Sequence, residues 1–266
     1  MSPWPYPRVL AHRGGGAFAP ENTIAAIRVG HQYGFRGVEF DVTLSADEEP
    51  VLIHDATLDR TTDGSGRVAD RSWAELAPLD AGSWFSSSFA GEPIPHLARV
   101  VDYCRSQPMW INAEIKPAPG AERRTGERVA AALAFAFADR LARDGAGVGP
   151  PDPQVPLLSS FSAEALAGAL HAAPHLPRAL LCSRIPEDWR ERLQQLACVA
   201  LHCDHRHLDA RWVETIRGAG FWVLCYTVIE RPRARELALW GIDALCTDRL
   251  DRVDAAFLDG AGDPLK

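Results

Sequence analysis

Eight short apolar runs recur along this chain, and longer segments whose apolar residues are three and four positions apart lie between them. The short runs are typical of buried strands, and the longer segments are typical of amphipathic helices. Because the alternation repeats eight times within about 250 residues, it predicts a (β/α)8 TIM barrel, with an open doubly wound sheet as the alternative. The predicted strands are Arg8–Ala11, Gly37–Asp41, Ile111–Ile115, Leu157–Ser160, Ala179–Cys182, Cys198–His202, Trp222–Tyr226 and Ala244–Thr247.

The segments between these strands carry residues that commonly start and end helices. The predicted helices are Thr23–Tyr33, Arg124–Arg143, Ala163–Ala172, Asp188–Leu196, Ala210–Gly218 and Arg231–Trp240. The candidate N-cap residues are Asn22, Ser162 and Asp209. The glycines that can end the preceding helices are Gly34, Gly145, Gly220 and Gly241.

One strand-like run, Pro50–His54, breaks the alternation. Only Val42–Glu49 separate it from the strand that ends at Asp41, and this is too short for a crossover helix. We therefore expect an antiparallel hairpin arm that brings His54 back towards the end of the second strand. The residues that follow, 56–95, contain no barrel strand and are predicted to form a small insertion after the second strand, beside the rim of the barrel.

Length and composition limit the possible classes of protein. A barrel of 266 residues is usually one folding unit, so residues 1–266 are predicted to form a single domain. The net charge of −7 creates no field that attracts nucleic acid, and no run approaches the roughly 18 apolar residues of a membrane span. With no leader-like N-terminus, we expect a cytoplasmic protein that binds neither nucleic acid nor membrane. The six cysteines are expected to be reduced, buried thiols, and nothing indicates the oligomeric state.

Charged residues stand where several predicted strands end. The groups are His12-Arg13, Glu39-Phe40-Asp41, His54-Asp55 and Glu114-Ile115-Lys116. Such side chains are rarely buried without partners, and the carboxyl ends of barrel strands meet at one rim. Four such groups therefore predict one site, most simply for a metal-assisted reaction on an anion.

The order of these motifs carries a family resemblance. The motifs are His12-Arg13-Gly14, Glu21-Asn22-Thr23, Glu39-x-Asp41, His54-Asp55 and Glu114-x-Lys116, and further similar segments are Trp4–Arg8, Asp80–Trp84, Leu157–Phe161 and Tyr226–Val228. Together they resemble the glycerophosphodiester phosphodiesterase family, in particular its cytosolic bacterial members associated with glycerol-3-phosphate uptake. The resemblance implies a distorted barrel that hydrolyses glycerophosphodiesters to sn-glycerol 3-phosphate and an alcohol. One departure is Ile229, where the family pattern has asparagine.

The carboxylates Glu39, Asp41 and Glu114 are the predicted metal ligands. They supply three hard oxygen ligands from two strand ends, which suits Mg²⁺ or Ca²⁺. Three bare carboxylates would repel a phosphodiester anion. A divalent cation, with Arg13 and Lys116, would turn their three negative charges into a small net positive charge that complements the substrate.

His12 and His54 are the predicted catalytic residues, because imidazole titrates near neutral pH and two rings can divide the roles of acid and base. Arg13 and Lys116 are predicted to bind the phosphate oxygens, Arg13 in a bidentate manner and Lys116 as a point charge. Tyr226 stands late on its predicted strand and is expected to contact the substrate.

Other polar residues receive weaker predictions. Glu21, Asn22 and Asp55 are expected to support the site, with a simple capping role open for Asn22, and Gly14-Gly15-Gly16 to form a turn rather than an anion cradle. A second group consists of His202, Asp204, His205 and His207, whose spacing does not match a zinc site. A rim role stays open for His202, which ends a predicted strand.

Two other functions stay in view. A non-catalytic barrel could bind a glycerophosphodiester without cleaving it, but the two candidate proton carriers argue against this. A phospholipase-type phosphodiesterase would act on lipid, but the chain shows no basic amphipathic helix to seat it on a membrane.

Overall fold

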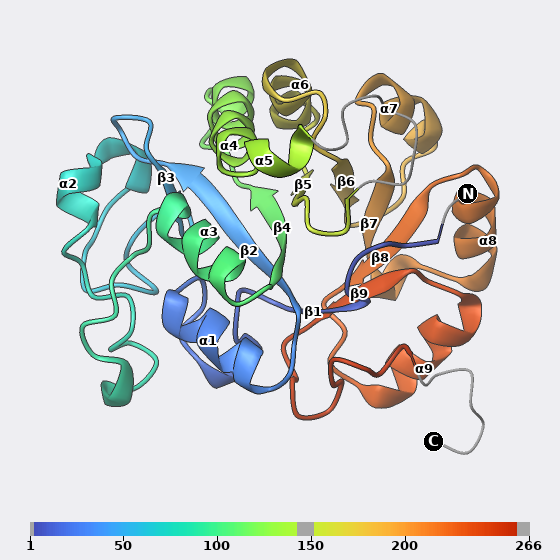
Figure 1. Cartoon of the computed structure of the whole chain (residues 1–266), viewed down its shortest axis with the longest axis horizontal. Coiled ribbons are helices and arrows are strands. Elements are labelled where there is room, and N and C mark those ends of the chain that lie inside the picture. Colours follow the sequence, from blue (N-terminus) through green and yellow to red (C-terminus); the bar gives the residue numbers. More distant parts are fainter. Residues whose placement is uncertain (1–2, 143–151, 260–266) are drawn as a thin grey trace.

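The computed structural model describes residues 3–142 and 152–259. Eight parallel strands close into a barrel, and helices pack around its outside (Figure 1). The strands follow the order β1-β2-β4-β5-β6-β7-β8-β9, and β9 pairs with β1 to complete the ring. Their bounds are β1 (Val9–Ala11), β2 (Gly37–Leu44), β4 (Trp110–Ile115), β5 (Leu157–Ser160), β6 (Arg178–Cys182), β7 (Ala200–Asp204), β8 (Trp222–Tyr226) and β9 (Ala244–Thr247). The predicted TIM barrel is confirmed.

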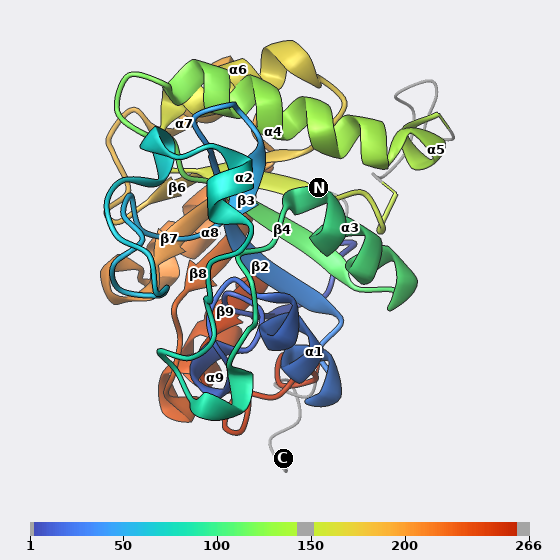
Figure 2. The ribbon, with the colours of Figure 1, turned by 90° about the vertical axis from the view of Figure 1, so that its left-hand side faces the viewer.

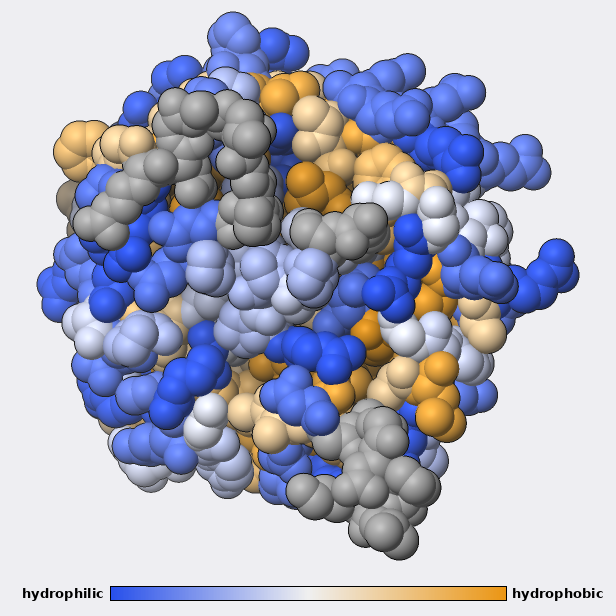
Figure 3. Space-filling view, turned by 45° about the vertical axis from the view of Figure 1, so that its right-hand side comes forward, coloured by the Kyte–Doolittle hydropathy of each residue, from blue (hydrophilic) through white to orange (hydrophobic). Residues whose placement is uncertain are grey.

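The helices follow the strands as the sequence pattern predicts, and Figure 2 shows α4 and α6 lying side by side. Those found among the described residues are α1 (Ile24–Gln32), α2 (Trp73–Leu76), α3 (Leu97–Ser106), α4 (Glu122–Ala136), α5 (Ala138–Leu141), α6 (Ala163–Ala172), α7 (Trp189–Gln195), α8 (Ala210–Gly218) and α9 (Arg231–Trp240). None of these helices is long and apolar enough to cross a membrane. On the face shown in Figure 3, apolar residues reach the surface in small groups between hydrophilic ones.

Several predicted element bounds differ from the structure. The second strand continues to Leu44 rather than ending at Asp41, because its last residues pair with the hairpin arm. The sixth barrel strand, β7, begins at Ala200 rather than Cys198, because the Cys198 N–H donates to the Leu193 carbonyl and so belongs to the turn that ends α7. The helix predicted over Arg124–Arg143 begins at Glu122 and is interrupted at Phe137, after which α5 continues. Both Arg143 and the predicted helix end at Gly145 lie outside the described residues.

The predicted hairpin is confirmed by β3 (Pro50–Leu52), which pairs antiparallel with the end of β2. Its register places Val42 opposite Leu52, and Ser45 and Glu49 bond across the turn. The hairpin carries the chain back along β2, so His54 follows directly beside the carboxyl end of the barrel.

The segment after β3 builds a small core of its own. Its buried hydrophobic residues are Val51, Ile53, Leu58, Val68, Leu76, Ala81 and Ile94. A capping box between Ser72 and Glu75 starts α2, which Figure 1 shows beyond the end of β2. The sequence analysis missed α3, although its buried residues Leu97, Val100, Val101 and Cys104 have helical spacing. The assignment of residues 1–266 to a single domain stays a prediction.

Aromatic side chains fill the amino-terminal end of the barrel, opposite the predicted site. Trp110 stacks on Tyr6 with ring centroids 4.3 Å apart, and Trp4 packs edge-on against both Trp110 and Trp222. The indole N–H of Trp110 also donates to the Val155 carbonyl at 2.8 Å. This end of the barrel is therefore closed by hydrophobic packing, which leaves the carboxyl end for polar groups.

We expect Trp110→Ala to lower the free energy of unfolding by about 3–5 kcal/mol, because it opens a cavity in this aromatic layer and removes a buried hydrogen bond. Denaturant unfolding monitored by circular dichroism measures the change. Leu239→Ala, at a position 78% exposed on α9, serves as the control and should change stability by less than about 0.5 kcal/mol. Similar values for the two variants would contradict the aromatic closure of the barrel.

Candidate active site

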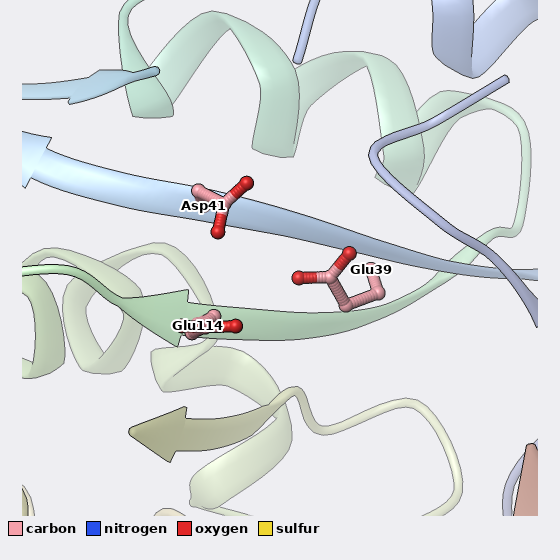
Figure 4. Close-up of side chains that lie close together, drawn as sticks. All are labelled: Glu39, Asp41 and Glu114. Carbon is pink, nitrogen blue, oxygen red and sulfur yellow. The ribbon is translucent and has the colours of Figure 1, made fainter. Parts of the chain in front are cut away.

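Three carboxylates from two neighbouring strands converge at the carboxyl end of the barrel. Glu39 and Asp41 stand two residues apart on β2 and therefore face the same side, and Asp41 is in register with Glu114 on β4. Figure 4 shows their carboxylates turned towards one another, and one oxygen of each lies within 4.8 Å of the others. Glu39 and Asp41 are buried and Glu114 is nearly so. The structure therefore brings all three predicted ligands together.

Crowding and burial work against the ionised forms of these groups. Burial, and then the charge of Asp41, raise the pKa of Glu39 to about 7 and that of Glu114 to about 8. The Oε1 atom of Glu114 is buried and accepts no hydrogen bond, although the Lys116 ammonium lies 3.2 Å from it. These buried carboxylate oxygens lie close together and have too few hydrogen-bond donors around them. Such a set of oxygens matches the ligands that a hard divalent cation takes. The donor set thus fits Mg²⁺ or Ca²⁺.

Two basic side chains adjoin the carboxylates. The backbone N–H of Arg13 donates to Glu39 at 3.1 Å, and the Arg13 guanidinium lies 3.4 Å from Asp41. The ammonium of Lys116 lies 3.2 Å from Glu114 and 3.9 Å from Asp41. Both predicted phosphate-binding residues therefore stand at the rim of the carboxylate cluster, where an anion would meet them.

Each predicted catalytic histidine is paired with a carboxylate. The Nδ1 atoms of His12 and His54 lie 2.6 Å from Asp248 and Asp55, respectively. These bonds turn the Nε2 atoms elsewhere: that of His12 is 3.8 Å from Glu39, and that of His54 is 3.2 Å from Lys116. Burial alone would lower the pKa of His12, but the bond to Asp248 and the charge of Glu39 outweigh it and raise that pKa.

Further polar residues hold this arrangement in place. Asn22 donates to the Asp41 carboxylate at 2.8 Å and accepts from the Asp41 backbone N–H at 2.9 Å. The capping role considered for Asn22 is wrong, because the N-cap of α1 is Thr23, whose side chain accepts from Ala26. Asn22 has a positive φ of 60°, which turns its side chain away from the helix and towards β2.

Two residues of the site escaped the sequence analysis. Asp248 follows β9 directly, so the strand-end argument could have found it. Arg60 lies in the insertion and joins Glu21 to Asp55 through hydrogen bonds of 2.6–3.0 Å, and no sequence signal marks it. Since Glu21 also bonds Arg13 at 2.7 Å, Arg60 links the two sides of the site.

The remaining predicted residues lie apart from the carboxylates. Tyr226 ends β8 and donates its hydroxyl to the Cys182 carbonyl at 2.9 Å, while its ring meets that of Phe161 edge-on at 6.0 Å. The rim role considered for His202 is wrong. The strand β7 continues beyond this residue to Asp204, and His202 is completely buried in the barrel. Among the described residues, only Glu39, Asp41 and Glu114 meet the geometry of a metal cluster, so His205 and His207 form no such group.

The glycine run after β1 forms a turn with close packing. Gly14 and Gly16 have φ values of 95° and 53°, which favour glycine. A Cβ atom on Gly16 would collide with the Asp248 backbone. The run thus lets the chain pass beside the residue that orients His12.

A cavity of about 740 Å³ opens beside the His54 half of the site. His54, Glu114 and Lys116 of the site line this cavity, and Arg67, Glu122 and Phe161 are among its other lining residues. The cavity also contacts the insertion at Thr57, Val68 and Ala69. A molecule bound against Lys116 would therefore have room to extend away from the carboxylates.

The fold and the site define an α/β-barrel with an acidic, histidine-flanked centre, and comparisons with known proteins agree. The model of the "Glycerophosphoryl diester phosphodiesterase family" matches residues 12–252. A glycerophosphodiester phosphodiesterase of Caldanaerobacter subterraneus subsp. tengcongensis is 33% identical over 246 residues, which cover 90% of this chain and 93% of that protein.

Solved structures show the same relationship. A phosphodiesterase of Oleispira antarctica, in complex with the product sn-glycerol-3-phosphate, is 36% identical with a TM-score of 0.81 and covers 97% of both chains. A glycerophosphodiester phosphodiesterase of Agrobacterium tumefaciens is 28% identical with a TM-score of 0.74 and covers 95% of this chain and 99% of that one. The chain therefore belongs to the glycerophosphoryl diester phosphodiesterase family, and the prediction of an enzyme of this class is confirmed.

Crowding of the carboxylates makes the stability of the cation-free protein depend on pH. The pKa values of Glu39 and Glu114 are raised from 4.5 to about 7 and about 8, so their stabilising contribution is complete below about 4.5 and is lost as the pH rises through 7 and 8. With a chelator present, we expect the Tm at pH 8.5 to lie at least about 3 °C below that at pH 6.

Glu114→Gln provides the control for this measurement, because glutamine keeps the shape and carries no charge at either pH. The decline in Tm between pH 6 and pH 8.5 should be smaller in this variant. An equal decline in both proteins would show that Glu114 does not titrate in this range.

Proposed function

We propose that the chain hydrolyses small glycerophosphodiesters to sn-glycerol 3-phosphate and an alcohol, in a reaction that requires a divalent cation. The single observation behind this proposal is the convergence of three buried carboxylates with two basic side chains and two carboxylate-paired histidines. The substrate class is supported by family membership and by the Oleispira antarctica relative, whose structure holds sn-glycerol-3-phosphate as product.

Release of glycerol 3-phosphate from glycerophosphocholine tests this function directly. Glycerophosphocholine in solution and phosphatidylcholine vesicles are offered in parallel, with Mg²⁺ or Ca²⁺ present. The proposal expects release from the soluble diester and none from the vesicles. Binding of glycerophosphocholine without release would favour the non-catalytic barrel, and preferential cleavage of the vesicles would favour a phospholipase.

The six cysteines, all buried and free, fit the reducing cytoplasm that we propose as the location of this protein.

Glu39, Asp41 and Glu114 would hold the cation, either Mg²⁺ or Ca²⁺. When bound there, the cation would neutralise charge on the phosphate oxygens and so assist the displacement. Arg13 and Lys116 add positive charge on two sides of the same place. Arg13 is already paired with Glu21 and Asp41, so it binds phosphate with its remaining N–H donors.

The histidines divide the proton transfers. Their bonds to Asp248 and Asp55 fix the tautomer in which Nδ1 carries the hydrogen and Nε2 faces the site. The Lys116 ammonium can only donate, and it lies 3.2 Å from Nε2 of His54, so this nitrogen is placed to accept. We therefore assign the base to His54 and the acid to His12. Tyr226 would contribute its ring, not its hydroxyl, to the wall that faces the substrate.

We expect Glu39→Ala, Asp41→Ala and Glu114→Ala each to abolish measurable turnover and to weaken cation binding, because each removes one oxygen ligand and leaves the barrel intact. Turnover assays and isothermal titration with Mg²⁺ or Ca²⁺ measure the two effects. Glu122→Ala, on the far wall of the cavity, is the control and should keep cation affinity. A ligand variant with wild-type affinity would remove that residue from the set.

We expect His12→Ala and His54→Ala to lower kcat by about 10²-fold or more, which is the usual effect of losing a general acid or base. Circular dichroism should show an unchanged fold. His31→Ala, on the outer helix α1, should leave kcat unchanged. If a site variant loses only thermal stability, its histidine has a structural role.

The nucleophile is proposed to be the substrate's own 2-hydroxyl. His54 would take its proton as the hydroxyl oxygen bonds to phosphorus, and the bond from phosphorus to the head-group oxygen would break as His12 donates a proton to that oxygen and the alcohol leaves. Water would then open the cyclic phosphate, with the roles of the two histidines reversed. A neighbouring hydroxyl has an advantage over water as the nucleophile, because its effective molarity reaches about 10⁵ M in well-oriented systems. An analogue of glycerophosphocholine that lacks this hydroxyl should bind but lose nearly all turnover. Hydrolysis of the analogue at a rate close to that of glycerophosphocholine would make water the direct nucleophile.

A further inference from the structure

At the level of Glu39 and below Glu114, the barrel interior contains buried polar atoms without hydrogen-bond partners. They are Oδ1 of Asn112, Oγ of Ser159, and both ring nitrogens of His202. His202 and Ser159 have no solvent-exposed surface. Each of the three residues follows an inward-facing hydrophobic residue by two positions, namely Trp110, Leu157 and Ala200, and therefore faces the barrel interior as well.

The strand registers place two of these residues in one layer with a proposed cation ligand. The strands of such a barrel tilt relative to its axis, so register partners do not lie at the same height. The side chain at the same height, two strands further round the barrel, stands two residues beyond the register partner. From Glu39 the registers lead through Asn112 to Leu157, and two residues further stands Ser159. The same step from Ser159 passes Ala179 and Ala200 and reaches His202.

The layer closes on itself. From His202 the registers lead through Leu224 to Ala244, and two residues further stands Cys246. Cys246 pairs with Leu10 on β1, and the next step returns to Glu39. One layer of four therefore contains Glu39, Ser159, His202 and Cys246. Ser159 is also the register partner of Glu114 on the adjacent strand.

A buried imidazole with neither nitrogen bonded is an expensive core residue, since a leucine of similar size would fill the same space without desolvating polar groups. Burial lowers the pKa of His202 to about 3, so the ring is neutral and offers one donor and one acceptor. Within the described residues, no metal-binding group includes it. Buried polar atoms of this kind are usually satisfied by enclosed water, which also bonds neighbouring polar groups.

We propose that His202 and Ser159 are positioning residues, which act through enclosed water on Glu39 from beside it and on Glu114 from below, and hold these carboxylates in place for the cation. This inference rests on the proposed function. Carboxylates only accept hydrogen bonds, and the cation would approach from the open end of the barrel. Donors from the closed side therefore fix the carboxylates without competing for the cation, as residues behind metal ligands commonly do.

Two variants of matched size separate this role from packing. His202→Leu removes the polar atoms, and His202→Gln keeps a donor and an acceptor in a side chain of similar volume. Isothermal titration with Mg²⁺ or Ca²⁺ alone measures cation affinity, and the Tm of the chelated protein measures stability. We expect His202→Leu to bind the cation at least about 10-fold more weakly with an equal or higher Tm, and His202→Gln to recover most of the affinity.

Ser159→Ala and Leu224→Val complete the test. Ser159→Ala should weaken cation binding in the same direction, and it keeps the test decisive if His202→Leu does not fold. Leu224→Val alters packing one layer below and should leave affinity unchanged. Wild-type cation affinity in both His202→Leu and Ser159→Ala would overturn this inference and leave the proposed function standing. Absence of cation binding by the wild-type protein would overturn the proposed function together with it.

Discussion

Mutual repulsion among Glu39, Asp41 and Glu114 is the constraint on which the rest of the site depends. Three carboxylates that are buried within 4.8 Å of one another cannot all ionise near neutral pH without a compensating positive charge. Arg13 and Lys116 supply part of that charge, and the raised pKa values of Glu39 and Glu114 show that this part is not enough. A divalent cation, as proposed above, would complete the balance, and its charge would also draw a phosphate anion to the site.

The packing that stabilises the barrel and the electrostatic repulsion of the carboxylates lie at opposite ends of the barrel axis. Aromatic rings close the amino-terminal end, and the charged groups stand at the carboxyl end of the same strands. β4 carries both: Trp110 belongs to the aromatic layer and Glu114 to the carboxylate cluster. The buried polar layer with Ser159 and His202 lies between the two ends, where it forms the floor of the site.

Most of the barrel could be predicted from the sequence, because its strands are buried on both faces and its outer helices have one apolar face. The hairpin could also be predicted, since Val42–Glu49 are too short to cross the barrel. The boundary of β7 could not, because the turn that ends α7 uses the backbone N–H of Cys198, which no side chain reveals. Because β7 also continues two residues beyond His202, to Asp204, His202 lies in the interior and not at the expected rim.

The residues of the site likewise divide into those that could be predicted from the sequence and those that could not. The strand-end charges Glu39, Asp41, His54 and Glu114 could be found because strand ends meet at one rim. Arg60 could not, since it acts from the insertion by bridging two carboxylates that lie 34 residues apart in the sequence. Asn22 had two interpretations, helix capping and support of Asp41, and the structure decides between them because Thr23 caps the helix while Asn22 bonds Asp41.

The dependence of the site on a cation is tested most directly by adding Mg²⁺ or Ca²⁺ stepwise to chelated protein, while bound cation and release of glycerol 3-phosphate from glycerophosphocholine are measured on the same samples. The carboxylate cluster predicts that turnover is absent without the cation and rises in proportion to the fraction of chains with an occupied site. Full turnover in the chelated protein, or saturated cation binding without turnover, would contradict this account.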